Sequence, residues 1–371
     1  MQKSKLHLFP ILSITAIILV IFYLSQRFTF FFNIQKPELL YLTFSIIIVF
    51  MFAGITFFIN STNHILSILY ITAYITAGII LYMTLSAIIV DLTKIFTNFR
   101  PICYGITIIV LTIIISAYGI WNSWNIRTTN LNIEIKGLTK NVRAVHLSDI
   151  HIGHFRGKKF MQKIADKTKA ANPDVVFITG DLFDSRIRLN NEAIEPLKQI
   201  KVPIYFVAGN HDRYTNVREI KHELTAIGVH VLSNEKTMFK DIQIIGLNHI
   251  IADENTTNRH AESGGPTIKS VLKSLPIDKN KPSILLHHSP DGIKYANKAG
   301  IDLYLTGHTH GGQMFPVNFI SGWMFDYNHG LHDYKGTKIF VSEGVGTFGP
   351  PMRVGTKSEI VVLNLTSTNN I

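Results

Sequence analysis

Four long stretches of apolar residues in the first third of the chain constrain its fold more than any other feature. None of them contains Asp, Glu, Lys or Arg, and each has about the 20 residues that an α-helix needs to cross a hydrocarbon core roughly 30 Å thick. We therefore expect a membrane region with four transmembrane helices over residues 1–127 and a second domain over residues 128–371. The four stretches are Leu6 to Leu24, Leu39 to Ile59, Ile65 to Val90 and Ile102 to Ile120.

The basic residues near these stretches favour one orientation in the membrane. An even number of spans places the N-terminus and everything after Trp124 on one side. Cytoplasmic loops carry an excess of Lys and Arg, so five basic residues on that side against four on the other favour a multi-pass cell-membrane protein with a cytoplasmic second domain. The five are Lys3, Lys5, Arg127, Lys136 and Lys140, and the four are Arg27, Lys36, Lys94 and Arg100.

Beyond the last apolar stretch the pattern changes to short β-branched runs that alternate with amphipathic segments. This alternation predicts an α/β domain of about 240 residues, which is large enough to bury its own core. The expected strands are 142–147, 175–179, 202–208, 242–247, 283–287, 301–305, 338–342 and 359–365. The expected helices are 158–171, 191–200, 217–227, a short one after residue 266, and 291–299.

The net charge of +11 does not indicate a nucleic-acid partner. No run of Lys and Arg is longer than two residues, and no stripe of alternating aromatic and basic residues is present. Attraction to anionic membrane lipids explains the basic balance better. Cys103 is the only cysteine, so one chain can form neither a disulfide nor a site with several thiolates. The sequence leaves the oligomeric state open.

Residue types that bind metals follow five of the expected strands at the point where each strand ends. Open α/β sheets bind their ligands at these ends, and imidazole and carboxylate are common metal ligands. Each motif alone also fits an ordinary turn, but the five together predict a metal site. The motifs are Asp149-x-His151, Gly180-Asp181-x-x-Asp184, Gly209-Asn210-His211-Asp212, His288-x-Pro290 and Gly307-His308-x-His310. In extended backbone, residues 149 and 151 would face the same side.

Taken in order, these motifs resemble the signature of the calcineurin-like metallophosphoesterases over residues 140–365. The segments 311–313 and 344–353 are similar to the membrane-associated bacterial branch of that family, some of whose members act on lipid-linked phosphates or pyrophosphates. The resemblance implies a four-layer α/β/β/α sandwich with metal ions at the strand ends, here preceded by the four-helix transmembrane region.

The resemblance also implies two divalent ions and their ligands. One ion would be held by Asp149, His151 and His310, the other by Asn210, His288 and His308, and Asp181 would bridge them. Such a pair of ions activates water for in-line attack on phosphorus. A set of nitrogen and oxygen ligands without thiolate suits Mn²⁺, Fe or Zn²⁺ and does not choose among them.

Further roles follow from the same resemblance. His211 would protonate the leaving oxygen or stabilise the transition state, Asp212 would orient it, and Arg353 would contact the substrate phosphate. Only one of His287 and His288 can face the ions, because neighbours in a strand face opposite sides, and the family pattern His-x-Pro selects His288. We expect Asp184 to brace its loop. The remaining histidines are expected at the surface or behind the ligands, among them His146, His154, His230, His249 and His332.

The leading functional hypothesis is a membrane-anchored two-metal phosphohydrolase that cleaves phosphoester or pyrophosphate bonds. A lipid-linked substrate is a candidate, because about seven residues from Trp124 to Leu131 span at most roughly 25 Å and the segment 314–325 is strongly apolar. The alternatives are a non-catalytic, metal-bound membrane receptor or scaffold, and a phosphodiesterase that acts on a soluble nucleotide. The complete set of expected ligands argues against the receptor.

Overall fold

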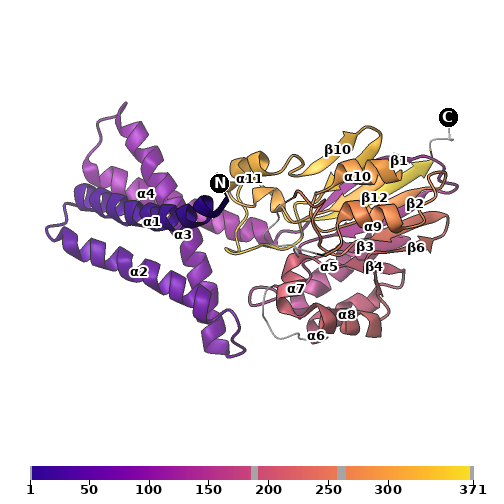
Figure 1. Ribbon diagram of the computed structural model, residues 1–371. Coiled ribbons are helices and arrows are strands. Elements are labelled where there is room, and N and C mark those ends of the chain that lie inside the picture. The colour runs from indigo at the N-terminus through magenta and orange to yellow at the C-terminus, as the bar shows by residue number, and fades with distance from the viewer. Residues whose placement is uncertain (1, 185–190, 257–264, 368–371) are drawn as a thin grey trace. The chain divides into compact units, whose positions relative to one another are not determined.

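The computed structural model describes residues 2–184, 191–256 and 265–367, which Figure 1 draws as ribbons. The chain divides into two compact units, Met1–Ile120 and Trp121–Ile371. The division falls before residue 127, so the last turn of the fourth apolar helix belongs to the second unit.

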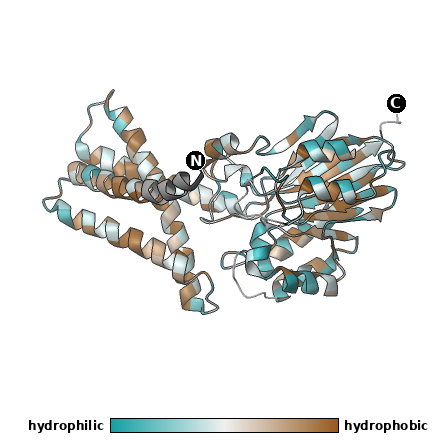
Figure 2. Cartoon of the chain, in the orientation of Figure 1, coloured by the Kyte–Doolittle hydropathy of each residue, from teal (hydrophilic) through white to brown (hydrophobic). Residues whose placement is uncertain are grey.

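The first unit consists of four helices that are long and apolar enough to cross a membrane, as the sequence predicts. Apolar residues predominate along these helices in Figure 2, as expected for helices that can cross a membrane. One ion pair joins two of them: Arg27 of the first helix lies 2.6 Å from Asp91 of the third, and the Tyr23 hydroxyl donates to the same carboxylate at 2.6 Å. The helices are α1 (Gln2–Phe32), α2 (Pro37–Phe57), α3 (His64–Lys94) and α4 (Pro101–Trp124).

The second unit contains two six-stranded mixed sheets, in the orders β1-β12-β2-β3-β4-β5 and β10-β11-β9-β8-β7-β6. All eight expected strands are present, and the four that the sequence analysis missed are the edge strands β1, β5, β6 and β10. The strands are β1 (Arg127–Ile135), β2 (Val142–Leu147), β3 (Val175–Thr179), β4 (Ile204–Val207), β5 (His230–Val231), β6 (Glu235–Phe239), β7 (Ile242–Gly246), β8 (Ser283–Leu286), β9 (Leu303–Thr306), β10 (Gly330–Tyr334), β11 (Thr337–Val341) and β12 (Glu359–Ser367).

Alternating side chains of the central strands divide the core into layers. Val175 and Phe177 of β3 pack between the two sheets, whereas Val176 and Ile178 pack on the outer face of the first sheet. The second sheet has its own outer cluster, to which Leu285 of β8 belongs. Helices cover both outer faces, so the unit is the four-layer α/β/β/α sandwich that the resemblance implies.

The helices of the second unit are short, and three of them were not expected. Residues 191–200 form a four-residue α-helix and a 3₁₀-helix because Pro196 interrupts the pattern. The unexpected helices are α7, which begins within the third motif, η2, which begins at the last residue of the fifth motif, and α11, which follows the fifth motif. The helices are α5 (Lys158–Ala170), α6 (Asn191–Ile194), η1 (Glu195–Gln199), α7 (Asn210–Thr215), α8 (Val217–Ala226), α9 (Ile268–Ser274), α10 (Ile293–Ala299), η2 (His310–Gly312) and α11 (Val317–Met324).

Candidate metal centre

The predicted ligands converge where β2, β3, β4, β8 and β9 end, and most of them have an unusual backbone. Five have a positive φ, between 51° and 72°: Asp149, His151, Asp181, His308 and His310. Left-handed backbone is costly for residues with a Cβ and clusters at functional sites. The expectation that residues 149 and 151 share a face of extended backbone is therefore wrong. The backbone N–H groups of Asp149 and His151 donate to the carbonyls of Gly180 and Asp181 at 3.0 Å. These bonds hold the loop after β2 against the loop after β3.

Two glycines allow the loops that carry these ligands to touch. A Cβ on Gly307 would lie 1.9 Å from the Ser148 hydroxyl and 2.2 Å from a carboxylate oxygen of Asp149. A Cβ on Gly209 would lie 2.1 Å from a carboxylate oxygen of Asp181. Any larger residue at either position would push the loops apart.

The predicted ligands form two groups, in each of which the ligand atoms lie within 4.8 Å of one another: Asp149, His151 and His310, and Asp181, His288 and His308. His151 also forms a third such group with Asp184 and His211. In the first group the Nε2 atoms of His151 and His310 are 3.2 Å apart, and Nε2 of His310 lies 3.4 Å from Asp149. In the second, Nε2 of His288 lies 3.1 Å from Asp181 and 3.2 Å from Nδ1 of His308.

Asp181 connects the two groups. Its Oδ2 atom lies 3.1 Å from Nε2 of His288 and 3.8 Å from Nε2 of His151. Its Oδ1 atom accepts a hydrogen bond from the backbone N–H of His211 at 2.9 Å. This position within reach of both groups is the one that a bridging carboxylate requires.

The residues fit divalent cations. In each group two imidazole nitrogens lie 3.2 Å apart. In a hydrogen bond between them one nitrogen donates, and only the other uses its lone pair as the acceptor. The Oδ1 atom of Asn210 is buried and has no hydrogen-bond partner among the described residues. Buried acceptors without partners are costly, and a cation coordinated by these atoms removes that cost.

The electrostatics of the centre also favour cations. Burial lowers the pKa of His288, but attraction to Asp181 outweighs it and raises the pKa to about 10. Burial also lowers the pKa of His211, but attraction to Asp181 and Asp184 outweighs it and raises the pKa to about 9. Burial raises the pKa of Asp149, whereas the positive charge of the neighbouring histidines keeps that of Asp181 well below its usual range. The carboxylates therefore hold a proton on His288, which a divalent ion bound there would displace.

His211 lies at the open side of the centre and is oriented by Asp184. Its Nδ1 atom is 3.3 Å from Oδ1 of Asp184, and its ring packs edge-on against His151, with centroids 4.9 Å apart. The prediction that Asp212 orients His211 is wrong. Asp212 is the third residue of α7, and its carboxylate accepts hydrogen bonds from the backbone N–H groups of Gly209 (2.9 Å) and Phe183 (3.1 Å). It stabilises the start of the helix that carries Asn210.

Arg353 is enclosed by the protein, and its predicted contact with a substrate phosphate stays a prediction. Its side chain is fully buried, and its N–H groups donate to backbone carbonyls and to the Thr356 hydroxyl. The carbonyls belong to His310, Glu343, Gly344 and Gly346. The guanidinium therefore fixes the loop that carries His310 against the loop that follows β11.

The structure selects His288 over His287 as the residue that faces the centre. The ring of His287 points to the outer side of the second sheet, where it bonds the Ser289 carbonyl at 2.7 Å and the Tyr304 hydroxyl at 2.9 Å. The buried ring of His249 lies 5.6 Å from that of His288 and 5.7 Å from that of His308. It belongs among the histidines expected behind the ligands, and its place directly after β7 is the sequence signal for it.

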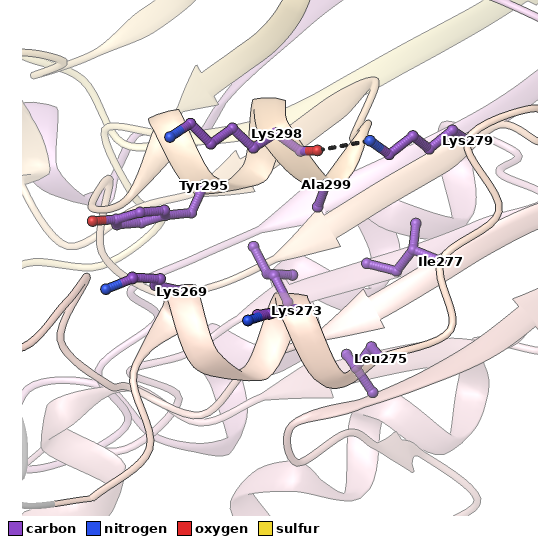
Figure 3. Close-up of a pocket in the computed structure, with 9 residues that line it drawn as sticks. Lys269, Lys273, Leu275, Ile277, Lys279, Tyr295, Lys298 and Ala299 are labelled. Atoms are coloured by element: carbon purple, nitrogen blue, oxygen red, sulfur yellow. Dashed lines mark hydrogen bonds between the residues drawn. The ribbon is translucent and has the colours of Figure 1, made fainter.

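Two aromatic side chains border the centre. The Phe348 ring lies 5.3 Å from that of His211 and is half exposed, and the Phe325 ring lies 5.8 Å from that of His308. A separate pocket of about 410 Å³ between α9 and α10 is lined by four lysines, Tyr295 and four apolar residues (Figure 3). None of its lining residues is a histidine or a carboxylate, so this pocket offers none of the residue types that make up the metal-ligand groups.

Comparison with known proteins agrees with this geometry. Residues 142–312 match the family described as calcineurin-like phosphoesterase. An uncharacterized metallophosphoesterase of Helicobacter pylori is 33% identical over 241 residues, which cover 64% of this chain and 63% of that protein. One of Campylobacter jejuni is 31% identical over 267 residues, covering 71% and 69%. A Danio rerio protein described as a transmembrane protein with metallophosphoesterase domain is 33% identical, covering 68% and 60%.

The matched region thus spans less than two thirds of the length of the Helicobacter and Danio relatives. The family match extends over the five motifs and the strands from β2 to β9. The calcineurin-like family consists of metal-dependent phosphoesterases, and the residues described above fit that chemistry. This chain belongs to the calcineurin-like metallophosphoesterases.

Proposed function

We propose that this protein is a membrane-anchored phosphohydrolase that uses two divalent ions, Mn²⁺, Fe or Zn²⁺, to cleave phosphoester or pyrophosphate bonds. Asp149, His151 and His310 would hold one ion, Asn210, His288 and His308 the other, and Asp181 both. The observation that carries the proposal is the position of Asp181, whose carboxylate lies 3.1 Å from one group of ligand atoms and 3.8 Å from the other.

Bound ions would supply an activated water and neutralise the phosphoryl oxygens. The protein's own contribution is a proton on His211, which the nearby carboxylates favour. Asp184 orients that ring from the Nδ1 side, so Nε2 is left to donate a proton to the leaving oxygen. A receptor or scaffold would not require a protonated histidine at the open side of a complete ligand set.

Turnover decides between the enzyme and the receptor. The purified full-length protein should hydrolyse a chromogenic phosphodiester when Mn²⁺ is present, lose this activity with a chelator, and regain it when Mn²⁺ is restored. A protein that binds two ions per chain yet shows no turnover on any phosphoester would support the receptor instead.

The proposal includes a topology with both termini and the hydrolase domain in the cytoplasm. It is supported by the four helices and by the five basic residues against four that flank them. Protease added to intact cells should spare the hydrolase domain and digest it after the membrane is permeabilised. Digestion in intact cells would reverse the orientation.

We also propose that the phosphate of the substrate is linked to a lipid. Support comes from the half-exposed Phe348 ring beside His211, because an apolar group next to the reacting phosphate would bury that ring. A hydrolysis screen across lipid-linked and soluble phosphoesters tests this. A soluble nucleotide diester hydrolysed at a higher kcat/KM than every lipid-linked compound would favour the alternative, a nucleotide phosphodiesterase.

A further inference from the structure

The helix α11 (Val317–Met324) has its polar side facing the protein and its apolar side facing outward. Ser321 is buried and donates a hydrogen bond to Asn328 at 2.6 Å, and the Asn318 backbone packs on Gly312. The exposed fractions on the other side are 67% for Phe319, 53% for Ile320, 88% for Trp323 and 66% for Met324. The helix α5 of the same domain shows the ordinary arrangement, with its Phe, Met and Ile residues buried and its lysines outside.

Such a surface needs a partner. Phe315, just before the helix, is also exposed, and its ring packs edge-on against Phe319. A contiguous patch of large apolar side chains is uncommon on a soluble protein and marks an interaction site. Trp, Phe and Met without charge are the residues that enter the boundary between lipid head groups and acyl chains.

The place of α11 within the second unit identifies the partner. The segment 351–356 accepts hydrogen bonds from the last turn of α4, in which Asn122 donates to the Arg353 and Thr356 carbonyls and Ser123 to that of Pro351. The same segment holds the start of α11, because the Phe315 N–H donates to the Val354 carbonyl at 2.8 Å. The apolar helix that spans the membrane and the apolar face of α11 are therefore attached to one short segment of the domain.

We propose that the apolar face of α11 inserts into the surface of the same membrane that α4 crosses. This inference rests on the membrane anchoring in the proposed function and deepens it. The contact between Asn318 and Gly312 joins α11 directly to the loop of His310. Insertion therefore places the metal centre at the level of the lipid phosphates, where a phosphate carried by a lipid can reach it.

Tryptophan fluorescence tests the insertion without requiring turnover or metal. The chain has three tryptophans, so the signal lost in Trp323→Phe belongs to Trp323. The full-length protein is placed in vesicles of phosphatidylcholine and phosphatidylglycerol, with or without lipids brominated near the top of the acyl chain. We expect brominated lipid to remove most of the Trp323 signal, and acrylamide in the water to remove little of it.

A matched control places a tryptophan on an exposed apolar position far along the chain. In the Trp323→Phe protein, Met238→Trp on the edge strand β6 should be quenched by acrylamide and not by brominated lipid. If acrylamide and not brominated lipid quenches Trp323, the helix faces water and the inference is wrong. If neither quenches it, protein covers the helix, for example a second copy, and the inference is again wrong. Failure to hydrolyse any phosphoester would contradict the proposed function without affecting this measurement.

Discussion

The buried floor of the metal centre and its open rim are built in different ways. The floor consists of Asp149, Asp181 and His288, which are almost fully buried and are positioned by backbone hydrogen bonds between strand ends. The rim consists of His211 with Asp184, the Phe348 ring and the helix α11, all of them partly exposed. The floor therefore tolerates almost no change in geometry, whereas the rim can change its side chains without unfolding the domain. We expect floor substitutions to remove metal and rim substitutions to alter rate or substrate preference.

The largest effect should come from Asp181→Asn. The substitution keeps the size of the side chain but removes the charge that lies within reach of both groups of ligands. We expect activity to be lost and the metal content, measured by mass spectrometry of the purified protein, to fall from two ions per chain. Two retained ions with near-normal turnover would show that the floor does not depend on this carboxylate.

A second floor substitution, Gly209→Ala, should act only through the volume of the added methyl group. The added methyl group would lie 2.1 Å from a carboxylate oxygen of Asp181 and 2.6 Å from its backbone nitrogen, so the backbone must move. We expect weaker metal binding by calorimetry and a loss of about 1–3 kcal/mol in the free energy of unfolding. Gly157→Ala is the control, because nothing lies within 4 Å of the added group, and metal binding should be unchanged. If the two variants bind metal equally well, the close packing around Gly209 is contradicted.

At the rim, His211→Ala should lower kcat by roughly 10² to 10⁴, the usual contribution of a positioned acid, and leave the metal content unchanged.

Asp184→Asn should give a smaller decrease in kcat, because the ring of His211 remains but is less well oriented. Asp212→Asn separates the two carboxylates: it should destabilise the start of α7 more than it changes the chemical step. Loss of metal from His211→Ala would show that His211 is a metal ligand and belongs to the floor rather than to the rim.

The smallest effect should come from α11. If the substrate is lipid-linked, replacing Phe319 and Trp323 by Ser should raise KM for the substrate in vesicles more than for a small soluble phosphodiester. Both side chains are more than half exposed, so the substitutions should not lower the melting temperature. Equal losses on the two substrates would mean that α11 supports the domain rather than meeting the membrane.

The sequence predicted the floor of the centre and the central strands because both are encoded locally. Central strands are continuous apolar runs, and the ligands follow them in motifs. The four missed strands, β1, β5, β6 and β10, are the edges of the sheets, where exposure on one side leaves polar residues and weakens the pattern.

The rim could not be predicted because it depends on long-range packing. Nothing local distinguishes Asp184 from Asp212 as the partner of His211, since the difference arises from the position of Asp212 as the third residue of α7. Likewise, the sequence does not show that Arg353 is enclosed by carbonyl groups of segments distant in the chain. The apolar composition of 314–325 was evident, but only the fold decides which side of α11 faces outward.

The hydrogen bonds of Asn122 and Ser123 have a consequence for dissecting the protein. Among the described residues no free linker follows the last predicted span, because the final turn of α4 and the buried Ile126 already belong to the second unit. A fragment starting at residue 128 would leave the carbonyls of Pro351 and Arg353 without these donors, next to the loop of His310. The last turn of α4 is therefore part of the fold of the second unit.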